Sequence, residues 1–152
     1  MPKNSNKTSG NKFEDDFSII LAKNGFWAHV MQQKKEGQPA DIIAVKGKFH
    51  TLIDCKEISD LSDGFPFTRC EENQRLAMKM FTKKCNELCY FALKLPVEEG
   101  KDPLSDIRLI SMSRIETLEN RSHKRLTPKM LDTETWRLED WLESATVWGK
   151  DE

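Results

Sequence analysis

The stretch that decides the fold is Ala40-Asp41-Ile42-Ile43-Ala44-Val45-Lys46-Gly47-Lys48, followed directly by Phe49-His50-Thr51-Leu52-Ile53-Asp54-Cys55-Lys56-Glu57. Two runs that are mostly apolar flank the dipeptide Gly47-Lys48. A two-residue loop that begins with glycine favours a type II′ turn, because the first loop position needs a positive φ. The sequence therefore predicts a β-hairpin with strands over residues 40–46 and 49–57.

The predicted register brings two carboxylates together. This loop pairs Lys46 with Phe49, and counting outward pairs Asp41 with Asp54. Like charges directly opposite each other destabilise a sheet unless something neutralises them. Mg²⁺ is a suitable neutraliser, since it binds one or two carboxylates and keeps several waters. Lys56 follows Asp54 by two residues and so faces the same side of the strand. This set is typical of metal-assisted phosphodiester cleavage.

A simpler interpretation of the same three residues remains open. Asp41 and Asp54 could be exposed acids at strand ends, with Lys56 as their salt-bridge partner. The apolar neighbours on both strands favour burial instead.

The rest of the chain alternates between helical and extended patterns. Residues 1–10 are polar and predict a disordered arm, and a helix begins at Asn11 and ends near Gly25. A second helix begins near Thr68, and its apolar residues Leu76, Met80 and Phe81 are expected to be buried. Further strands are predicted over 26–31, 88–95 and 107–112, and further helices over 114–120, from Pro128, and over 134–145. The fold class is thus α/β (mixed α+β), with a mixed five-stranded sheet flanked by helices.

Length and composition fit one domain over residues 11–152. The chain has 152 residues, 38% hydrophobic and 32% charged. It contains no apolar run of the ~20 residues that span a bilayer, and no signal-peptide pattern, so we expect a soluble cytoplasmic protein without membrane contact. The cysteines at 55, 70, 85 and 89 lack a zinc-site spacing and are expected to be free, buried thiols.

The charge distribution is uneven. The net charge is −1, but residues 133–152 hold six acids and two bases, a net of −4, so residues 1–132 carry +3. Basic residues gather at 34–35, 79–84 and 121–125. A local basic surface can bind phosphate groups even when the total charge is close to zero.

Around the hairpin, the sequence resembles the PD-(D/E)XK nuclease superfamily, with its restriction-endonuclease-like core. The motif is Pro39-Ala40-Asp41, twelve residues, then Asp54-Cys55-Lys56, with one inserted alanine. Within the superfamily the chain is most similar to Holliday junction resolvases of the RecU type. Further pieces that carry this resemblance are Gly10-Asn11-Lys12-Phe13-Glu14-Asp15-Asp16, Gly64-Phe65-Pro66-Phe67 and Glu71-Glu72-Asn73-Gln74.

The resemblance implies a role for each matching residue. Asp41, Asp54 and the Cys55 backbone carbonyl would bind Mg²⁺, or alternatively Mn²⁺, and Glu14 would bind the metal directly or through water. Lys56 would orient the attacking water or stabilise charge at phosphorus, and Gln74 would position water or phosphate. Candidate DNA contacts are Lys12, Lys34, Lys35 and Arg69.

Some of these residues have an ordinary alternative. Glu14 could be one of three solvated acids with Asp15 and Asp16, and a helical glutamine such as Gln74 is usually at the surface. Lys34 and Lys35 could be ordinary loop residues.

The resemblance also implies a function and an assembly. RecU-type enzymes carry a long stalk insertion between the first strand and the hairpin, whereas this chain has only residues 32–38 there, a compactness closer to archaeal resolvases. The expected protein is a homodimeric endonuclease that cuts four-way DNA junctions by paired nicks, with an interface in the final strand and the tryptophan-containing segment. The alternatives are a nuclease of this fold that acts on other DNA, as a restriction-like enzyme or repair nickase, and a catalytically silent DNA-binding module.

Overall fold

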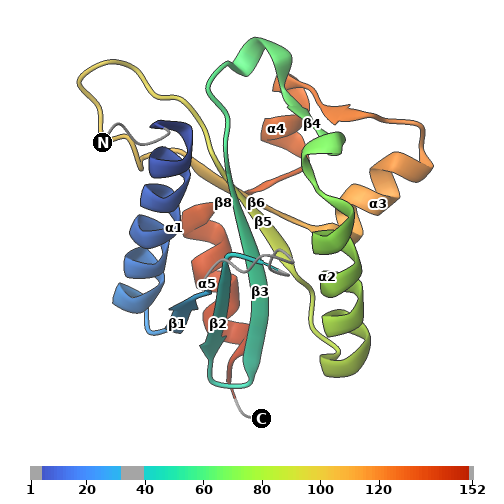
Figure 1. The fold of residues 1–152 in the computed structure, drawn as a ribbon. Coiled ribbons are helices and arrows are strands. Elements are labelled where there is room, and N and C mark those ends of the chain that lie inside the picture. The colour runs from blue at the N-terminus through green and yellow to red at the C-terminus, as the bar shows by residue number, and fades with distance from the viewer. Residues whose placement is uncertain (1–4, 32–39, 151–152) are drawn as a thin grey trace.

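The predicted hairpin forms the middle of a six-stranded sheet in the computed structural model, which describes residues 5–31 and 40–150 (Figure 1). Strands β2 (Ile42–Lys46) and β3 (Phe49–Glu57) pair from Lys46↔Phe49 to Ile42↔Ile53, so the predicted register is confirmed over this range. Gly47 has a φ of 58° and Lys48 does not have a positive φ, as a type II′ turn requires.

The remaining strands extend the sheet on both sides of the hairpin. Strand β1 (Trp27–Val30) pairs antiparallel with β2, and β5 (Tyr90–Lys94) pairs parallel with β3. A parallel pair needs a crossover connection, which α2 (Glu72–Cys85) supplies. Strands β6 (Ile107–Ser111) and β8 (Trp136–Arg137) complete the order β1-β2-β3-β5-β6-β8.

Helices cover both faces of this sheet (Figure 1). On one face, α1 (Ser5–Lys23) and α5 (Leu138–Trp148) bury Phe13, Phe17 and Trp141 against the strands. The other face is covered by α2, α3 (Met112–Asn120) and α4 (Pro128–Thr133). The short 3₁₀ helices η1 (Leu61–Asp63) and η2 (Phe67–Arg69) flank β4 (Phe65–Pro66), which pairs with β7 (Arg125–Leu126) in a second, two-stranded sheet.

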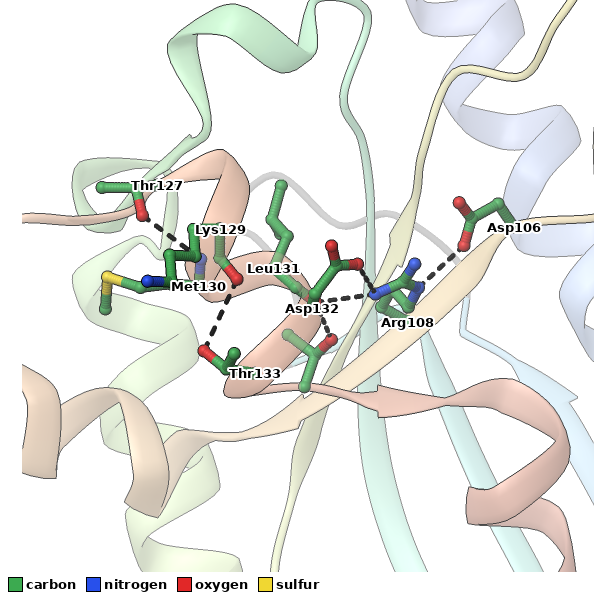
Figure 2. Close-up of polar contacts among 9 residues, drawn as sticks. Asp106, Arg108, Thr127, Lys129, Met130, Leu131, Asp132 and Thr133 are labelled. Carbon is green, nitrogen blue, oxygen red and sulfur yellow. Dashed lines mark hydrogen bonds and ion pairs between the residues drawn. The ribbon is translucent and has the colours of Figure 1, made fainter.

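A buried arginine fastens α4 to the main sheet (Figure 2). Arg108 on β6 is 4% exposed, and its guanidinium donates to Asp106 Oδ1 at 2.7 Å and to Asp132 Oδ1 at 3.0 Å. It also donates to the Leu131 carbonyl at 2.7 Å. A buried cation is tolerated when carboxylates pair with it and hydrogen bonds satisfy it, so this contact fixes the position of α4 over the sheet.

Several sequence-based boundaries differ from the structure. Helix α1 begins at Ser5 rather than Asn11, so residues 5–10 are helical and not part of a disordered arm. The sheet has six strands because Trp136–Arg137, predicted as part of the last helix, pairs with β6. Helix α3 begins at Met112, two residues before the predicted start, and is capped by Ser111, whose side chain accepts from the Arg114 amide.

The predicted buried face of α2 is wrong. Leu76 and Met80 are 57% and 55% exposed, whereas Gln74 and Met78 are buried. Phe81 is partly buried against the core, in contact with the His50 ring. The buried face of α2 is thus the one that carries Gln74 and Met78. Leu76 and Met80 are left exposed to solvent.

Two other expectations concern the whole chain. The four cysteines are free, as predicted. Cys70 and Cys89 are buried as expected, whereas Cys55 and Cys85 are only partly buried. No helix among the described residues is long and apolar enough to cross a membrane.

Candidate active site

Strand β3 presents Asp54 and Lys56 on the side of the sheet that α2 covers. Side chains alternate along a strand, and Ile53 and Cys55 pack toward α1 and α5 on the opposite face. Asp54 is 1% exposed, and Lys56 Nζ lies 3.1 Å from Asp54 Oδ2 as an ion pair. The exposed strand-end interpretation is therefore wrong for Asp54, and also for Asp41, which is 7% exposed.

Helix α2 supplies Gln74 to this pair. Gln74 is buried, and its Nε2 donates to Asp54 Oδ1 at 3.0 Å. Its Oε1 in turn accepts from the Glu71 amide at 3.3 Å as half of a capping box. The start of α2 thereby fixes the glutamine against Asp54, and the surface alternative for Gln74 is wrong.

Asp41 lies just outside β2, where the hairpin ladder changes. The ladder ends at Ile42↔Ile53, and beyond it the Asp41 amide donates to the Ile53 carbonyl at 3.1 Å. The Cys55 amide then donates to Asp41 Oδ2 at 2.7 Å. The Asp41 side chain thus replaces a backbone carbonyl as the acceptor for this amide. The expected pairing of Asp41 with Asp54 thus lies one step beyond the regular ladder.

Glu14 on α1 completes a group of three interacting carboxyls. Burial, followed by the charge of Asp41 and a hydrogen bond with it, raises the pKa of Glu14 to about 8, and Asp54 contributes further. Burial and Asp41 likewise raise the pKa of Asp54 to about 8, while Lys56 lowers it. Crowded, desolvated carboxyls favour the protonated form. The structure thus brings Glu14, Asp41, Asp54, Lys56 and Gln74 together.

The neighbouring thiol is not a nucleophile candidate. Burial, followed by Asp41, Asp54 and Glu14, raises the pKa of Cys55 well above its usual value. A neutral, buried thiol of this kind is chemically inert. The Cys55 backbone carbonyl stays a prediction as a metal ligand.

The donor set fits one small cation held by few protein ligands. Asp54 Oδ2 is buried and lies 3.1 Å from Lys56 Nζ, while Asp54 Oδ1 accepts from Gln74. No three His, Cys, Asp or Glu side chains in the described ranges form a preassembled metal cage. Mg²⁺ does not need one, because it is usually bound by one or two carboxylates and keeps several waters. Asp41 and Asp54 meet that requirement.

The predicted DNA-contacting residues are dispersed. Lys12 is exposed and forms an ion pair with Asp16 at 3.3 Å. Arg69 is exposed on η2 and donates to the Glu57 carbonyl at 2.8 Å, one residue beyond Lys56. Lys34 and Lys35 lie outside the described residues.

Sequence reasoning missed the positioning role of Glu71. Its side chain accepts from the Gln74 backbone amide while its own amide donates to the Gln74 side chain. The three-residue spacing of a capping box was present in the sequence. The N-cap residue of a capping box is usually Ser or Thr. Because Glu71 occupies that position here, the sequence did not indicate a capping box.

The fold is similar to that of a solved Holliday junction resolvase. One solved structure that the chain matches is Hjc, a Holliday junction resolvase from the archaeal hyperthermophile Archaeoglobus fulgidus. The TM-score is 0.63 at 21% sequence identity, and the match covers 90% of this chain and 99% of that one. The likeness shows the fold and gives no separate support to the RecU type. No model of a known protein family matches the sequence, and no curated protein matches it.

Proposed function

We propose that the protein is a metal-dependent DNA endonuclease that resolves four-way junctions. The observation that carries this proposal is the buried Asp54, which lies against Lys56, Gln74 and a second carboxyl, that of Asp41. Burying two acids side by side destabilises a fold without a cation. A site for phosphodiester hydrolysis explains why this arrangement is present, and the resolvase fold supports the same conclusion.

Asp41 and Asp54 would hold Mg²⁺, with Mn²⁺ as a substitute, and Glu14 would reach it directly or through water. When bound, such an ion acts as a Lewis acid on the phosphate and lowers the pKa of its water. The raised pKa values of Glu14 and Asp54 imply that protons leave these carboxyls when the ion binds.

Lys56 and Gln74 would act on the attacking water and on the phosphate. The Lys56 ammonium, beside Asp54, would orient the attacking water or stabilise negative charge that develops on the phosphate oxygens. The Gln74 amide donates to Asp54 Oδ1, and this hydrogen bond holds the carboxylate in one orientation. Its amide is also placed to position water or phosphate at the site.

The first prediction is the cleavage pattern. With Mg²⁺, we expect the protein to introduce symmetric paired nicks near the crossover of a mobile four-way junction, and no nicks in EDTA. Linear duplex of the same sequence should be cut much more slowly. Denaturing electrophoresis of junctions labelled on each strand measures both. Equal cutting of linear duplex would instead identify a nuclease of this fold with another DNA substrate, and binding without any cutting would identify a silent module.

The archaeal resolvase is the better guide to substrate handling. Residues 32–38 are too few to form a RecU-type stalk between β1 and β2. The chain would therefore recognise the junction without a stalk. The RecU-like sequence pieces then reflect the shared nuclease core.

The second prediction concerns a homodimer, which would match the twofold symmetry of paired nicks. Leu76 and Met80 are one helical turn apart on the exposed side of α2, an apolar pair that a second copy could bury. We expect L76D/M80D to be monomeric by light scattering after gel filtration, while wild type is dimeric. Ile19→Asp on α1, which is 53% exposed, is the matched control and should stay dimeric.

The dimer has a competing interface. The exposed Trp136 and Trp148 are in edge-to-face contact and belong to the segment that the sequence suggested. If W136A/W148A separates the subunits and the α2 variant does not, the interface lies there. A monomeric wild type at high concentration contradicts dimerisation itself.

A further inference from the structure

The turn between α3 and β7 is a compact basic element that the active site does not account for. Residues 121–131 contain four Lys or Arg (Arg121, Lys124, Arg125 and Lys129) and no Asp or Glu. Residues 132–152 contain seven acids and two bases. Three of those acids, Glu139, Asp140 and Glu143, lie on α5, which covers the opposite face of the sheet from α2 and α3. Residues 121–131 are therefore a locally basic part of the chain.

The backbone of the turn holds its basic side chains outward. Ser122 has a φ of 73°, in the left-handed region, and its amide donates to the Glu119 carbonyl at 2.9 Å. The His123 amide donates to the Leu118 carbonyl at 3.0 Å. A non-glycine residue with positive φ is uncommon and persists where the surroundings fix it. Arg121, His123 and Lys124 are all exposed.

A hollow of about 510 Å³ lies beside the turn, between α3 and η2. Its rim carries groups that bind phosphate oxygens: the Thr68 and Ser122 hydroxyls, His123 and Lys124. Glu119 is the acid in its lining, and Arg75 neutralises it through two contacts, at 2.6 and 3.0 Å. The lining thus combines these polar groups with the apolar Phe67 and Cys70, and its one carboxylate is already paired.

Hydrogen bonds connect this hollow to the proposed active site. The Phe67 amide donates to the Lys124 carbonyl at 3.0 Å, which ties the turn to η2. At the other end of η2, Arg69 donates to the Glu57 carbonyl at 2.8 Å, next to Lys56. The turn, η2, the start of α2 and Lys56 thus lie on the same side of the sheet. A DNA strand that reaches Asp54 from this side would pass the basic turn.

We propose that the hollow between η2 and the α3–β7 turn binds backbone phosphates of a DNA arm through His123 and Lys124, together with the exposed Arg121 of the same turn. This proposal rests on the proposed nuclease function and gives a role to a part of the chain that the nuclease motif does not include. Because phosphate contacts carry no base information, the site would anchor the arm irrespective of its sequence.

The test is the salt dependence of DNA binding by the full chain. Each phosphate neutralised by a cation contributes about −0.9 to the slope of log K against log salt. R121A/K124A should therefore lower the magnitude of the slope by about 1.8 and weaken binding to a four-way junction by about 60-fold at 0.1 M salt. Ca²⁺ replaces Mg²⁺ in these titrations to suppress cutting. Lys83 and Lys84 provide the control, since both are exposed near the far end of α2.

The outcomes separate the two proposals. A reduced slope for R121A/K124A with an unchanged slope for K83A/K84A supports the phosphate site. Equal losses in both pairs mean that only total charge matters, which overturns it. If wild type binds and cuts the junction and R121A/K124A keeps the wild-type slope, the phosphate site is wrong and the nuclease function stands. If wild type binds neither junction nor duplex, both proposals fail.

Discussion

Asp54→Asn is expected to abolish junction cleavage and, in the absence of metal, to make the protein more stable at pH 8. Cleavage should fall by at least about 10³-fold, because the amide cannot hold Mg²⁺ or balance its charge. The fold should be kept, since the asparagine oxygen can still accept from Gln74 Nε2. Both effects arise from the same buried carboxylate, which is 1% exposed.

The sign of the stability change follows from the raised pKa. The pKa of Asp54 is about 8 in the folded protein and 3.8 as an ordinary carboxyl, so the folded state binds more protons between about pH 4 and 8. Stability is therefore lost as pH rises through this window, and Asn removes that loss. In EDTA at pH 8 the melting temperature should rise by about 4 °C, with little change at pH 4.

Scanning calorimetry at both pH values tests this expectation. Glu143→Gln removes one exposed charge from α5 and should change neither activity nor the pH dependence. A variant that melts lower than wild type at pH 8 in EDTA would mean that Asp54 is a stabilising charge and not a metal-binding one.

Lys56→Met is expected to remove cleavage while preserving junction binding. The loss should be about 10³-fold, because the ammonium that would stabilise charge at the phosphate is gone. Removing it also leaves Asp54 buried without its cation, which should destabilise the fold by about 3 kcal/mol at pH 8. At pH 5 the cost should be smaller. Lys56 lowers the pKa of Asp54, so without it the carboxyl is protonated over a wider pH range.

Single-turnover cleavage and a binding titration in Ca²⁺ distinguish the two effects of Lys56. Lys48→Met, in the hairpin turn at the opposite end of β3, is the matched control and should cut normally. Should Lys56→Met retain wild-type cleavage, the water-orienting and charge-stabilising role belongs to another group.

The hairpin could be predicted from sequence because its signals are local. Gly47 fixes the turn, the turn fixes the register, and the register places Asp41 and Asp54 at the same end. The sequence resemblance then added Glu14 and Gln74, which the fold brings to the same carboxylates. Their separation along the chain means that periodicity alone could not have grouped them.

The outer face of α2 could not be predicted, because its apolar pattern was misleading. Leu76, Met80 and Phe81 suggested the core face, yet the helix buries Gln74, a polar residue, against Asp54. A functional contact at the helix start thereby decides its rotation, and helical periodicity contains no such information. Strand β8 was missed for another reason: two residues, Trp136 and Arg137, are too few to show alternation.

The hairpin turn also has a partner at the far end of the chain. The Lys48 amide donates to the Gly149 carbonyl at 3.0 Å, and a Cβ on Gly47 would lie 2.1 Å from that oxygen. A Cβ on Gly149 would lie 2.3 Å from the Lys46 carbonyl. Neither glycine can accept a side chain unless the other segment moves. Over evolutionary time the two positions are therefore expected to vary together or not at all, and trimming the chain before residue 149 would leave the tip of the β2–β3 hairpin unsupported.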